Sequence, residues 1–272
     1  MSDDFGEVIH SSIWEEQAEP DHPFTAAACY CRGYDVYGDV LGKAGYLEYL
    51  YLLLKGERPS PASLAAFELL AIALANPGPR DPAVHAAMAA GTTGSPAAAV
   101  LMAALAVGAG SYGGAREVLL FMEAWHQRGP DLALWCERLR APPAPTRAQI
   151  WPEAEHAPGF DAYARLCAAP VRQTLEQLLP IFPAGCLAWL ARERAALEAA
   201  AARPLALTGV AAATLIDLGF TADEGEMLTL LLRLPGAAAH ALEQKQQGFR
   251  QFPFFALDLQ DDPGPVACED KR

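Results

Sequence analysis

Apolar residues recur at spacings of three and four along most of this 272-residue chain, and Gly and Pro interrupt the pattern at short intervals. Such spacing places apolar side chains on one face of an α-helix. Ser60-Pro61 and Ser95-Pro96 each join an N-cap residue to a Pro suited to the first turn, and Gly56 is typical of a helix end. No stretch alternates with period two for long enough to predict a substantial sheet. We therefore expect an all-α fold.

The pattern predicts helices that end at Gly56, run from Pro61 to Leu74, start at Pro82, cover Ala97–Val107 and Ala115–Arg128, and cover about 170–179, 184–202, 209–218, 222–233 and 236–247. The wholly apolar run Ala97–Val107 is expected to be buried. The abundant Ala residues predict closely spaced helix axes, because small side chains let helices approach one another. The Pro-rich segment 141–158 predicts an irregular connection, and the tail from Asp258 is expected to fray.

Charge and hydropathy exclude several classes of protein. Apolar residues make up 52% of the chain and charged residues 19%, so the chain is not mainly disordered. The formal net charge is −13, which disfavours nucleic acids and acidic lipid surfaces as partners. The first residues lack the basic and apolar parts of a secretory signal, and no apolar run is long enough to span a membrane. We expect a cytoplasmic protein with no nucleic acid or membrane partner.

No motif predicts a metal or a bound cofactor. Cys29 and Cys31 form the one close cysteine pair, and a single intervening residue is a weak signal for a metal site. The chain has no GxSxG, HExxH, phosphate-binding loop or dinucleotide fingerprint. We therefore expect no metal.

A glycine-rich turn and two arginines are candidates for ligand binding. Gly108–Gly114 joins two predicted helices, and its N–H groups could bind an anion or a carbonyl oxygen. A tight turn between helices is the alternative, although the bulky Tyr112 is unusual there. Arg233 and Arg250 lie in apolar surroundings and could either clamp a polyacid or form ion pairs within the protein.

Other polar residues favour structural roles. Asp161 follows Pro158-Gly-Phe160 and suits a cap at the start of a helix. Asp217 lies late in an apolar helix and is expected to be structural. His240 and Glu243 are one turn apart, which predicts a helix cap or a contact between subunits.

Six segments carry a resemblance to a known family. They are Arg32–Asp35 (RGYD), Tyr51–Pro59 (YLLLKGERP), Ser111–Glu117 (SYGGARE), Pro158–Phe160 (PGF), Leu207–Val210 with Asp217–Phe220, and Arg233–Glu243. YLLLKGERP is similar to the family's YLLLKGELP, and SYGGARE is placed like its LHGGANE. Together they resemble the citrate synthase superfamily, most closely citryl-CoA lyase and the matching C-terminal module of ATP-citrate lyase. The resemblance covers about residues 25 to 255.

This resemblance implies an all-α protein of two domains. The large, many-helix domain would comprise residues 1–112 and 209–272, and the smaller helical domain residues 113–208. It also implies a homodimer that handles a polycarboxylate and an acyl-CoA. Coenzyme A would then be part of a thioester substrate rather than a bound cofactor.

The family's three catalytic side chains are replaced in this sequence. Tyr112 occupies the position of a histidine that hydrogen-bonds the thioester oxygen, and Asp161-Ala162 stands where a second histidine holds the four-carbon acid. Thr208 replaces the aspartate that acts as general base. A threonine hydroxyl does not accept a carbon-bound proton near neutral pH. The standard reaction is therefore expected to be lost or altered.

The substrate-binding positions are only partly retained. Pro77 occupies the position of a further histidine. Val171 occupies that of an arginine, with Arg172 beside it. Arg233 and Arg250 match two anion-binding arginines, of which the second reaches the partner's site in the family.

Two alternatives to a protein without the standard activity remain open. One is an active lyase or acyltransferase that makes or breaks a carbon–carbon bond next to a CoA thioester of a different substrate. Tyr112 would then donate to the oxyanion, and Asp161 would act as the acid or base. The other is a non-catalytic or regulatory subunit that pairs with a paralogous protein through a shared helical face.

Overall fold

Helices make up most of the computed structural model, which describes residues 10–140 and 156–254. The elements are β1 (Trp14–Glu19), β2 (His22–Cys31), β3 (Tyr34–Asp35), η1 (Val36–Val40), α1 (Tyr46–Lys55), α2 (Pro61–Ala75), α3 (Pro82–Thr92), α4 (Ala97–Gly108), α5 (Ala115–Arg128), α6 (Leu132–Arg140), α7 (Ala169–Leu178), α8 (Cys186–Ala201), α9 (Leu207–Asp217), α10 (Ala222–Gln247) and η2 (Phe249–Gln251). Most of the segment predicted to be irregular, and the tail from Asp258, lie outside the described residues.

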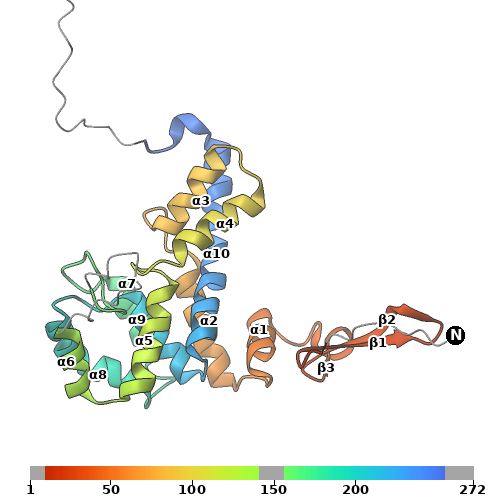
Figure 1. The fold of residues 1–272 in the computed structure, drawn as a ribbon, viewed down its shortest axis with the longest axis horizontal. Coiled ribbons are helices and arrows are strands. Elements are labelled where there is room, and N and C mark those ends of the chain that lie inside the picture. The colour runs from red at the N-terminus through yellow and green to blue at the C-terminus, as the bar shows by residue number, and fades with distance from the viewer. Residues whose placement is uncertain (1–9, 141–155, 255–272) are drawn as a thin grey trace, which may run out of the picture.

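The helices form two packed groups that share α10 (Figure 1). One group contains α2 and α5 to α9 with the first part of α10, and it encloses the larger hydrophobic core. The other contains α3, α4 and the last part of α10, with a smaller core around Val84, Ala87 and Ala237. The predicted all-α class is confirmed for the body of the molecule.

Side-chain caps begin several helices where the sequence predicts them. The Ser60 hydroxyl accepts a hydrogen bond from the Ser63 N–H at the start of α2. Asp81 caps α3, and Thr221 with Glu224 forms a reciprocal capping box at the start of α10. These bonds satisfy N–H groups that have no partner within the helix.

The segment 222–247 forms one helix, whereas the Pro at 235 predicts a break between two helices. Pro235 removes one hydrogen bond, which leaves the carbonyl of Leu231 without its helical partner. Both residues are exposed, so water can solvate that carbonyl. Leu232 and Ala237 on the opposite side are buried in the two cores, and this packing holds the helix together. The structure also contains α6, which the periodicity does not predict.

A three-stranded antiparallel sheet at the N-terminus departs from the sequence-based expectation. Trp14 pairs with Cys31 between β1 and β2, and Tyr30 pairs with Asp35 between β2 and β3. The sheet projects away from the helices (Figure 1), and all of β1 is exposed. Period-two alternation arises where one face of a sheet is buried, and β1 has no buried face. The hairpin therefore leaves little trace in the hydropathy pattern.

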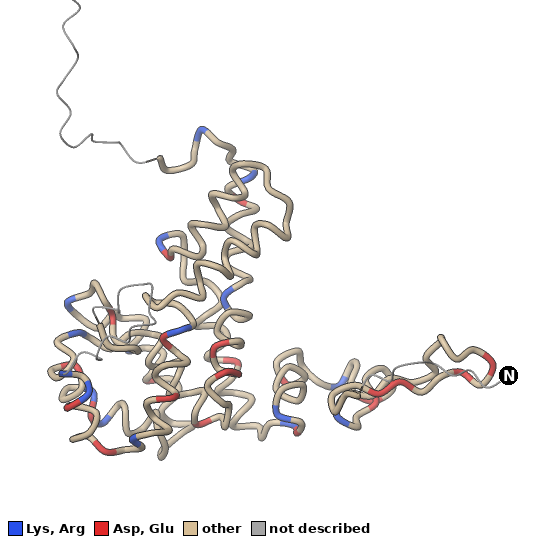
Figure 2. The backbone as a smooth tube through the Cα atoms, in the orientation of Figure 1, with Lys and Arg blue, Asp and Glu red and all other residues tan. Residues whose placement is uncertain are grey.

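Helix α4 is only partly buried, so the prediction that Ala97–Val107 is buried is wrong for one of its faces. Met102 is 61% exposed and Val107 is 43% exposed, while Val100 and Ala104 pack into the smaller core. Few charged residues lie along α3 and α4 (Figure 2). Hydropathy predicts that an apolar face is buried, but the elements of a single chain do not bury every such face.

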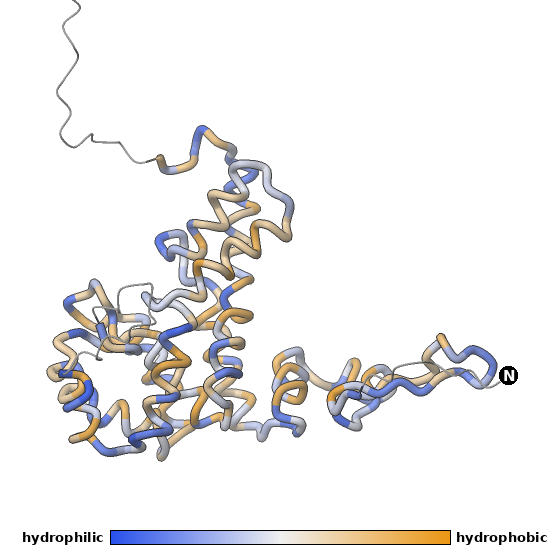
Figure 3. Tube along the Cα trace, in the orientation of Figure 1, coloured by the Kyte–Doolittle hydropathy of each residue, from blue (hydrophilic) through white to orange (hydrophobic). Residues whose placement is uncertain are grey.

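Small residues let helices pack closely, as the Ala content predicts. A Cβ atom on Gly91 would lie 2.6 Å from the carbonyl oxygen of Ala241, and one on Gly236 would lie 2.4 Å from that of Ala75. These contacts join α3 and α2 to α10. Hydrophobic and hydrophilic residues alternate along α10 (Figure 3), and no helix in the described ranges has the length and hydropathy to cross a bilayer.

Gly236→Ala is expected to destabilise the protein even though Ala favours helices by about 1 kcal/mol over Gly. The added methyl would push α10 away from α2, a kind of overpacking that costs about 1–3 kcal/mol. Urea unfolding measures the change. At the exposed position 239 of the same helix, Ala239→Gly serves as the control and should cost about 1 kcal/mol. Stabilisation by Gly236→Ala would contradict the close packing.

Candidate functional site

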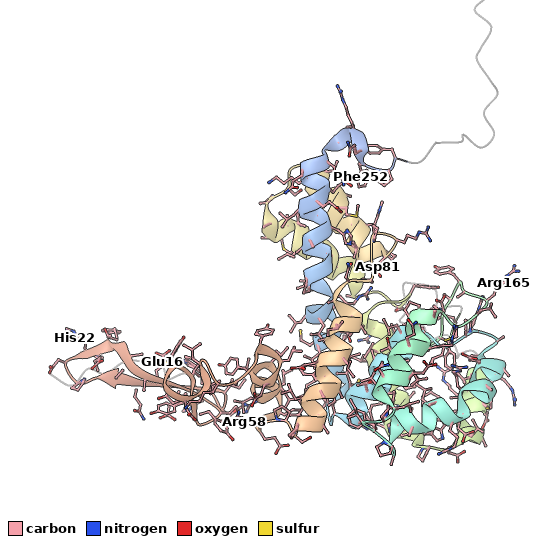
Figure 4. The ribbon with its side chains drawn as sticks, turned by 180° about the vertical axis from the view of Figure 1, so that it is seen from behind. Glu16, His22, Arg58, Asp81, Arg165 and Phe252 are labelled. Atoms are coloured by element: carbon pink, nitrogen blue, oxygen red, sulfur yellow. The ribbon has the colours of Figure 1, made fainter. Side chains whose placement is uncertain are left out.

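One cavity of about 300 Å³ lies where α2, α5, α7, α9 and α10 meet. Its lining residues are Ala73, Leu74, Pro77, Asp81, Pro82, Tyr112, Gly113, Glu117, Val118, Phe160, Asp161, Ala162, Tyr163, Val171, Ala206, Leu207, Thr208, Ala211, Thr229 and Arg233. Asp81 marks the place where the α3–α4 group meets the other helices (Figure 4). The lining is mainly apolar, with a few polar groups that converge on the space.

The cavity brings together most of the candidate residues. Tyr112, Asp161, Thr208 and Arg233 all line it, although they come from four separate parts of the sequence. The other positions that the resemblance marks, namely Pro77, Ala162 and Val171, line it as well.

Arg172 and Arg250 do not line this cavity. The guanidinium of Arg172 donates to the carbonyl of Cys167. Arg250 lies in η2, and α10 rises about 1.5 Å per residue, which places it roughly 20 Å beyond Arg233. Within one chain, Arg250 therefore takes no part in the cavity.

Gly159 and Gly209 lie opposite each other and let the loop that contains Gly159 pack closely against the start of α9. A Cβ on Gly209 would lie 2.6 Å from the carbonyl oxygen of Gly159, so a side chain there would collide with the loop. Ala206 donates its N–H to that same oxygen at 2.9 Å, and the Asp161 N–H bonds the carbonyl of Pro204 at 2.8 Å. This contact sets Thr208 next to the N-terminal end of α5.

Glu117 is the centre of a buried hydrogen-bond cluster at that place. Its Oε2 accepts the hydroxyl proton of Thr208 at 2.7 Å, and its Oε1 accepts the N–H of Gly113 at 2.7 Å. The Nε2 of His156 lies 2.6 Å from Oε1. The side chain of Glu117 is only 2% exposed, and Glu117 is one of the residues that line the cavity. The cluster joins α5, α9 and the loop after residue 155.

His156 is the side chain that lies closest to this carboxylate in the salt-bridge geometry. No Lys or Arg among the described residues forms an ion pair with Glu117; His156 does. The imidazole is 1% exposed, and its Nδ1 has no hydrogen-bond partner within the described part of the chain. The ring of Tyr112 packs against it, with the two ring centroids 5.0 Å apart. The neighbourhood is therefore a buried carboxyl–imidazole pair beside an aromatic ring.

The glycine-rich turn binds the carboxylate of Glu117, which belongs to α5, the helix that follows the turn. The N–H of Gly113 is used by Glu117, so it is not open to a ligand. The carbonyl of Gly113 accepts a hydrogen bond from Arg233 Nη1 at 2.9 Å. A Cβ on Gly114 would lie 2.2 Å from the carbonyl oxygen of Gly110, which explains the glycine there.

Arg233 forms an ion pair within the protein, which was one of the two alternatives. Its Nη2 contacts Oδ2 of Asp81, and both side chains are largely buried. The Oδ1 of Asp81 also accepts the N–H groups of Ala83 and Val84 at the start of α3. The charged lining of the cavity thus consists of three carboxylates, Asp81, Glu117 and Asp161, and one guanidinium.

The remaining polar candidates have structural partners. Oδ1 of Asp161 accepts the N–H groups of Tyr163 and Ala164 at 2.9 and 2.8 Å, as a cap does. Asp217 binds the first N–H groups of α8, and burial raises the pKa of its carboxyl above the ordinary value. His240 lies 3.0 Å from the side-chain oxygen of Asn76 and 3.5 Å from Glu243.

Sequence reasoning missed Glu117 and His156. Glu117 lies inside the quoted SYGGARE segment and one turn before the buried Phe121, so its place on the apolar face was a usable signal. His156 fell in a segment interpreted as an irregular connection, and no local pattern marked it. Within the described residues, no group of three or more His, Cys, Asp or Glu side chains could hold a metal ion.

Comparison with solved structures finds the same fold in many chains, three of which illustrate the likeness. Citryl-CoA lyase from Hydrogenobacter thermophilus aligns with a TM-score of 0.67 over 94% of this chain and 98% of its own, at 17% identity. ATP citrate lyase from Methanothrix soehngenii, in complex with citrate and coenzyme A, gives 0.70 over 97% of this chain and 42% of its own, also at 17% identity. Citrate synthase from the archaeon Thermoplasma acidophilum gives 0.56 over 82% and 60%, at 16% identity. The sequence matches no family model and no curated protein.

His156→Ala is expected to lower the free energy of unfolding by about 1–3 kcal/mol, because it leaves the buried Glu117 carboxyl without one of its hydrogen-bond partners. Adding Glu117→Gln to this variant removes the buried carboxyl and should restore part of the loss. Chemical denaturation of the two single variants and the double variant gives the coupling. His126→Ala, at an exposed position of α5, is the control. Strictly additive losses would contradict this pairing.

Proposed function

We propose that this chain, which has the fold of citrate synthase and citryl-CoA lyase, binds a CoA thioester in the cavity and has lost the standard citrate reaction. One observation carries the proposal: Tyr112, Asp161 and Thr208, which stand where the family has its catalytic residues, all line the same cavity. The Thermoplasma enzyme was solved with carboxymethyl coenzyme A and oxaloacetate, and the Methanothrix enzyme with citrate and coenzyme A. The lining residues also come from both of the domains that the resemblance implies.

The loss of the standard reaction follows from the chemistry of the replacements. A Thr208 hydroxyl cannot hold the proton that an aspartate would take, and here it donates its own proton to Glu117. A Tyr112 phenol can donate a hydrogen bond but does not carry the charge of an imidazolium. Removing one such group commonly costs about 10²–10³-fold in rate, and groups that act together fail together.

The cavity is poorly suited to a polycarboxylate in its present state. Its one guanidinium, Arg233, is already paired with Asp81, and two further carboxylates lie in the same lining. A citrate molecule would have to displace Asp81 and face like charges. We therefore propose that a polycarboxylate, the expected second ligand, binds weakly here.

We propose a cytoplasmic homodimer as the functional unit. The exposed apolar face of α4 fits a contact with a second copy, and Arg250 would add a cation only to a partner's cavity. Cys29, Cys31, Cys136, Cys167 and Cys186 are free thiols, as in proteins of a reducing compartment.

A second function, an active acyl-CoA enzyme with a different substrate, is favoured by one observation. Glu117, a carboxylate in the cavity lining, is coupled to an imidazole. Such a pair can move a proton even though the residues at the family's catalytic positions cannot.

The purified protein is expected to bind acetyl-CoA and to show no turnover with acetyl-CoA plus oxaloacetate or with citryl-CoA. Calorimetry measures binding, and release or consumption of the free thiol measures turnover. The Hydrogenobacter citryl-CoA lyase in the same assay is the positive control. Turnover comparable to that enzyme would refute the loss of function, and absence of binding would refute the proposed ligand.

Asp81→Asn is expected to tighten citrate binding about tenfold or more, because it frees Arg233 from its internal anion. Asn is as good an N-cap as Asp, so α3 should keep its start. Asp131→Asn is the matched control, since Asp131 also caps a helix and lies outside the cavity. Calorimetric titration with citrate measures both variants. An unchanged affinity in Asp81→Asn would show that the ion pair does not limit binding.

A further inference from the structure

We propose that Glu117 is the proton acceptor of this cavity, with His156 as its ionisable partner and Thr208 as the group that orients it. The inference rests on the proposed function in one respect, namely that the cavity takes an acyl-CoA. It goes beyond that function because it assigns proton transfer to residues outside the family's catalytic positions.

The hydrogen bonds of Glu117 leave one acceptor position open. Oε1 faces both the N–H of Gly113 and the Nε2 of His156, whereas Oε2 accepts only from Thr208. A carboxylate oxygen can accept two hydrogen bonds, so Oε2 keeps an unused lone pair. Glu117 belongs to the cavity lining, and in the proposed step this lone pair accepts the ligand proton.

The partner of Glu117 is suited to proton transfer. A buried carboxyl group needs hydrogen-bond partners, and among the described residues His156 is the ionisable side chain in contact with it. At 2.6 Å, the Nε2 of His156 lies within direct hydrogen-bond distance of Oε1. His156 Nδ1 is buried and unpartnered, which a purely structural histidine usually avoids.

Asp161 is the competing carboxylate, and its geometry is less favourable. Its Oδ1 is bound to two backbone N–H groups, and its side chain holds the turn at residues 161–164. No His, Lys or Arg among the described residues forms an ion pair with it. The alternative is a purely structural role for Glu117. Its hydrogen bonds would then only join α5, α9 and the loop at residue 156, and it would take part in no reaction.

The step is a reversible proton transfer at the carbon next to the thioester carbonyl. Glu117 takes a proton from this carbon, the electron pair of the C–H bond forms the second bond between the two carbons, and the π pair of the C=O bond moves onto oxygen, which gives an enolate. Collapse of the enolate takes a proton back from Glu117 to the carbon. In D₂O the carboxyl proton exchanges with solvent, so the ligand gains deuterium while no other bond changes.

Exchange of the acetyl protons of acetyl-CoA in D₂O tests the proposal. Proton NMR follows the methyl signal, and calorimetry on the same samples measures binding. The full-length protein should accelerate exchange over buffer alone. Glu117→Gln should lower the exchange rate by about 10²–10⁴-fold at unchanged affinity for acetyl-CoA. Glu123→Gln, the same substitution at an exposed position of α5, should leave the rate unchanged.

Further variants distinguish Glu117 from Asp161 as the proton acceptor. If Glu117→Gln does not fold, Glu117→Asp keeps the charge and moves it back by one methylene, which should lower exchange about tenfold or more. Binding without exchange in the unaltered protein, or full exchange in a folded Glu117 variant, overturns the inference and leaves the proposed function intact. Loss of exchange in Asp161→Asn but not in Glu117→Gln overturns it in favour of Asp161. Absence of acetyl-CoA binding contradicts the proposed function, and the inference with it.

Discussion

The need to satisfy one buried carboxylate organises the centre of this molecule. Glu117 accepts hydrogen bonds from Gly113 and Thr208 and contacts His156, and these partners come from three separate segments. A buried charge without such partners would cost several kcal/mol, so the segments are held in one arrangement. The glycines of the turn before α5, and the Gly159–Gly209 contact, follow from the same need because they let the backbones approach. The cavity is the space that this arrangement leaves open.

The scaffold and the chemistry of the cavity depend on different residues, which is why a fold can persist while its site changes. Helix packing rests on buried apolar side chains and on Gly and Ala at close contacts. The ionisable groups at the cavity are paired as Asp81–Arg233 and Glu117–His156. Fold similarity at 17% identity therefore shows the fold alone, and support for a reaction has to come from the side chains of this chain.

Much of the fold and part of the site could be predicted from the sequence. Capping residues and apolar periodicity located most helices, and the order of the motifs predicted that Tyr112, Thr208 and Arg233 belong together. The N-terminal sheet was missed because its strands lack a buried face, and the continuity of α10 because packing outweighs the effect of Pro235. Glu117 and His156 escaped notice because their pairing depends on a contact between distant segments.

The sequence by itself determined the all-α class and the positions of the caps, since both depend on residues within a few positions of one another. Its resemblance to a known family also predicts a phenol and a hydroxyl at positions where that family has catalytic groups. Only the tertiary structure decided that Arg233 is neutralised by Asp81 and that a carboxylate on α5 meets an imidazole after residue 155. Charge pairing acts through space over a few ångströms, and the folded chain alone sets which distant side chains come that close.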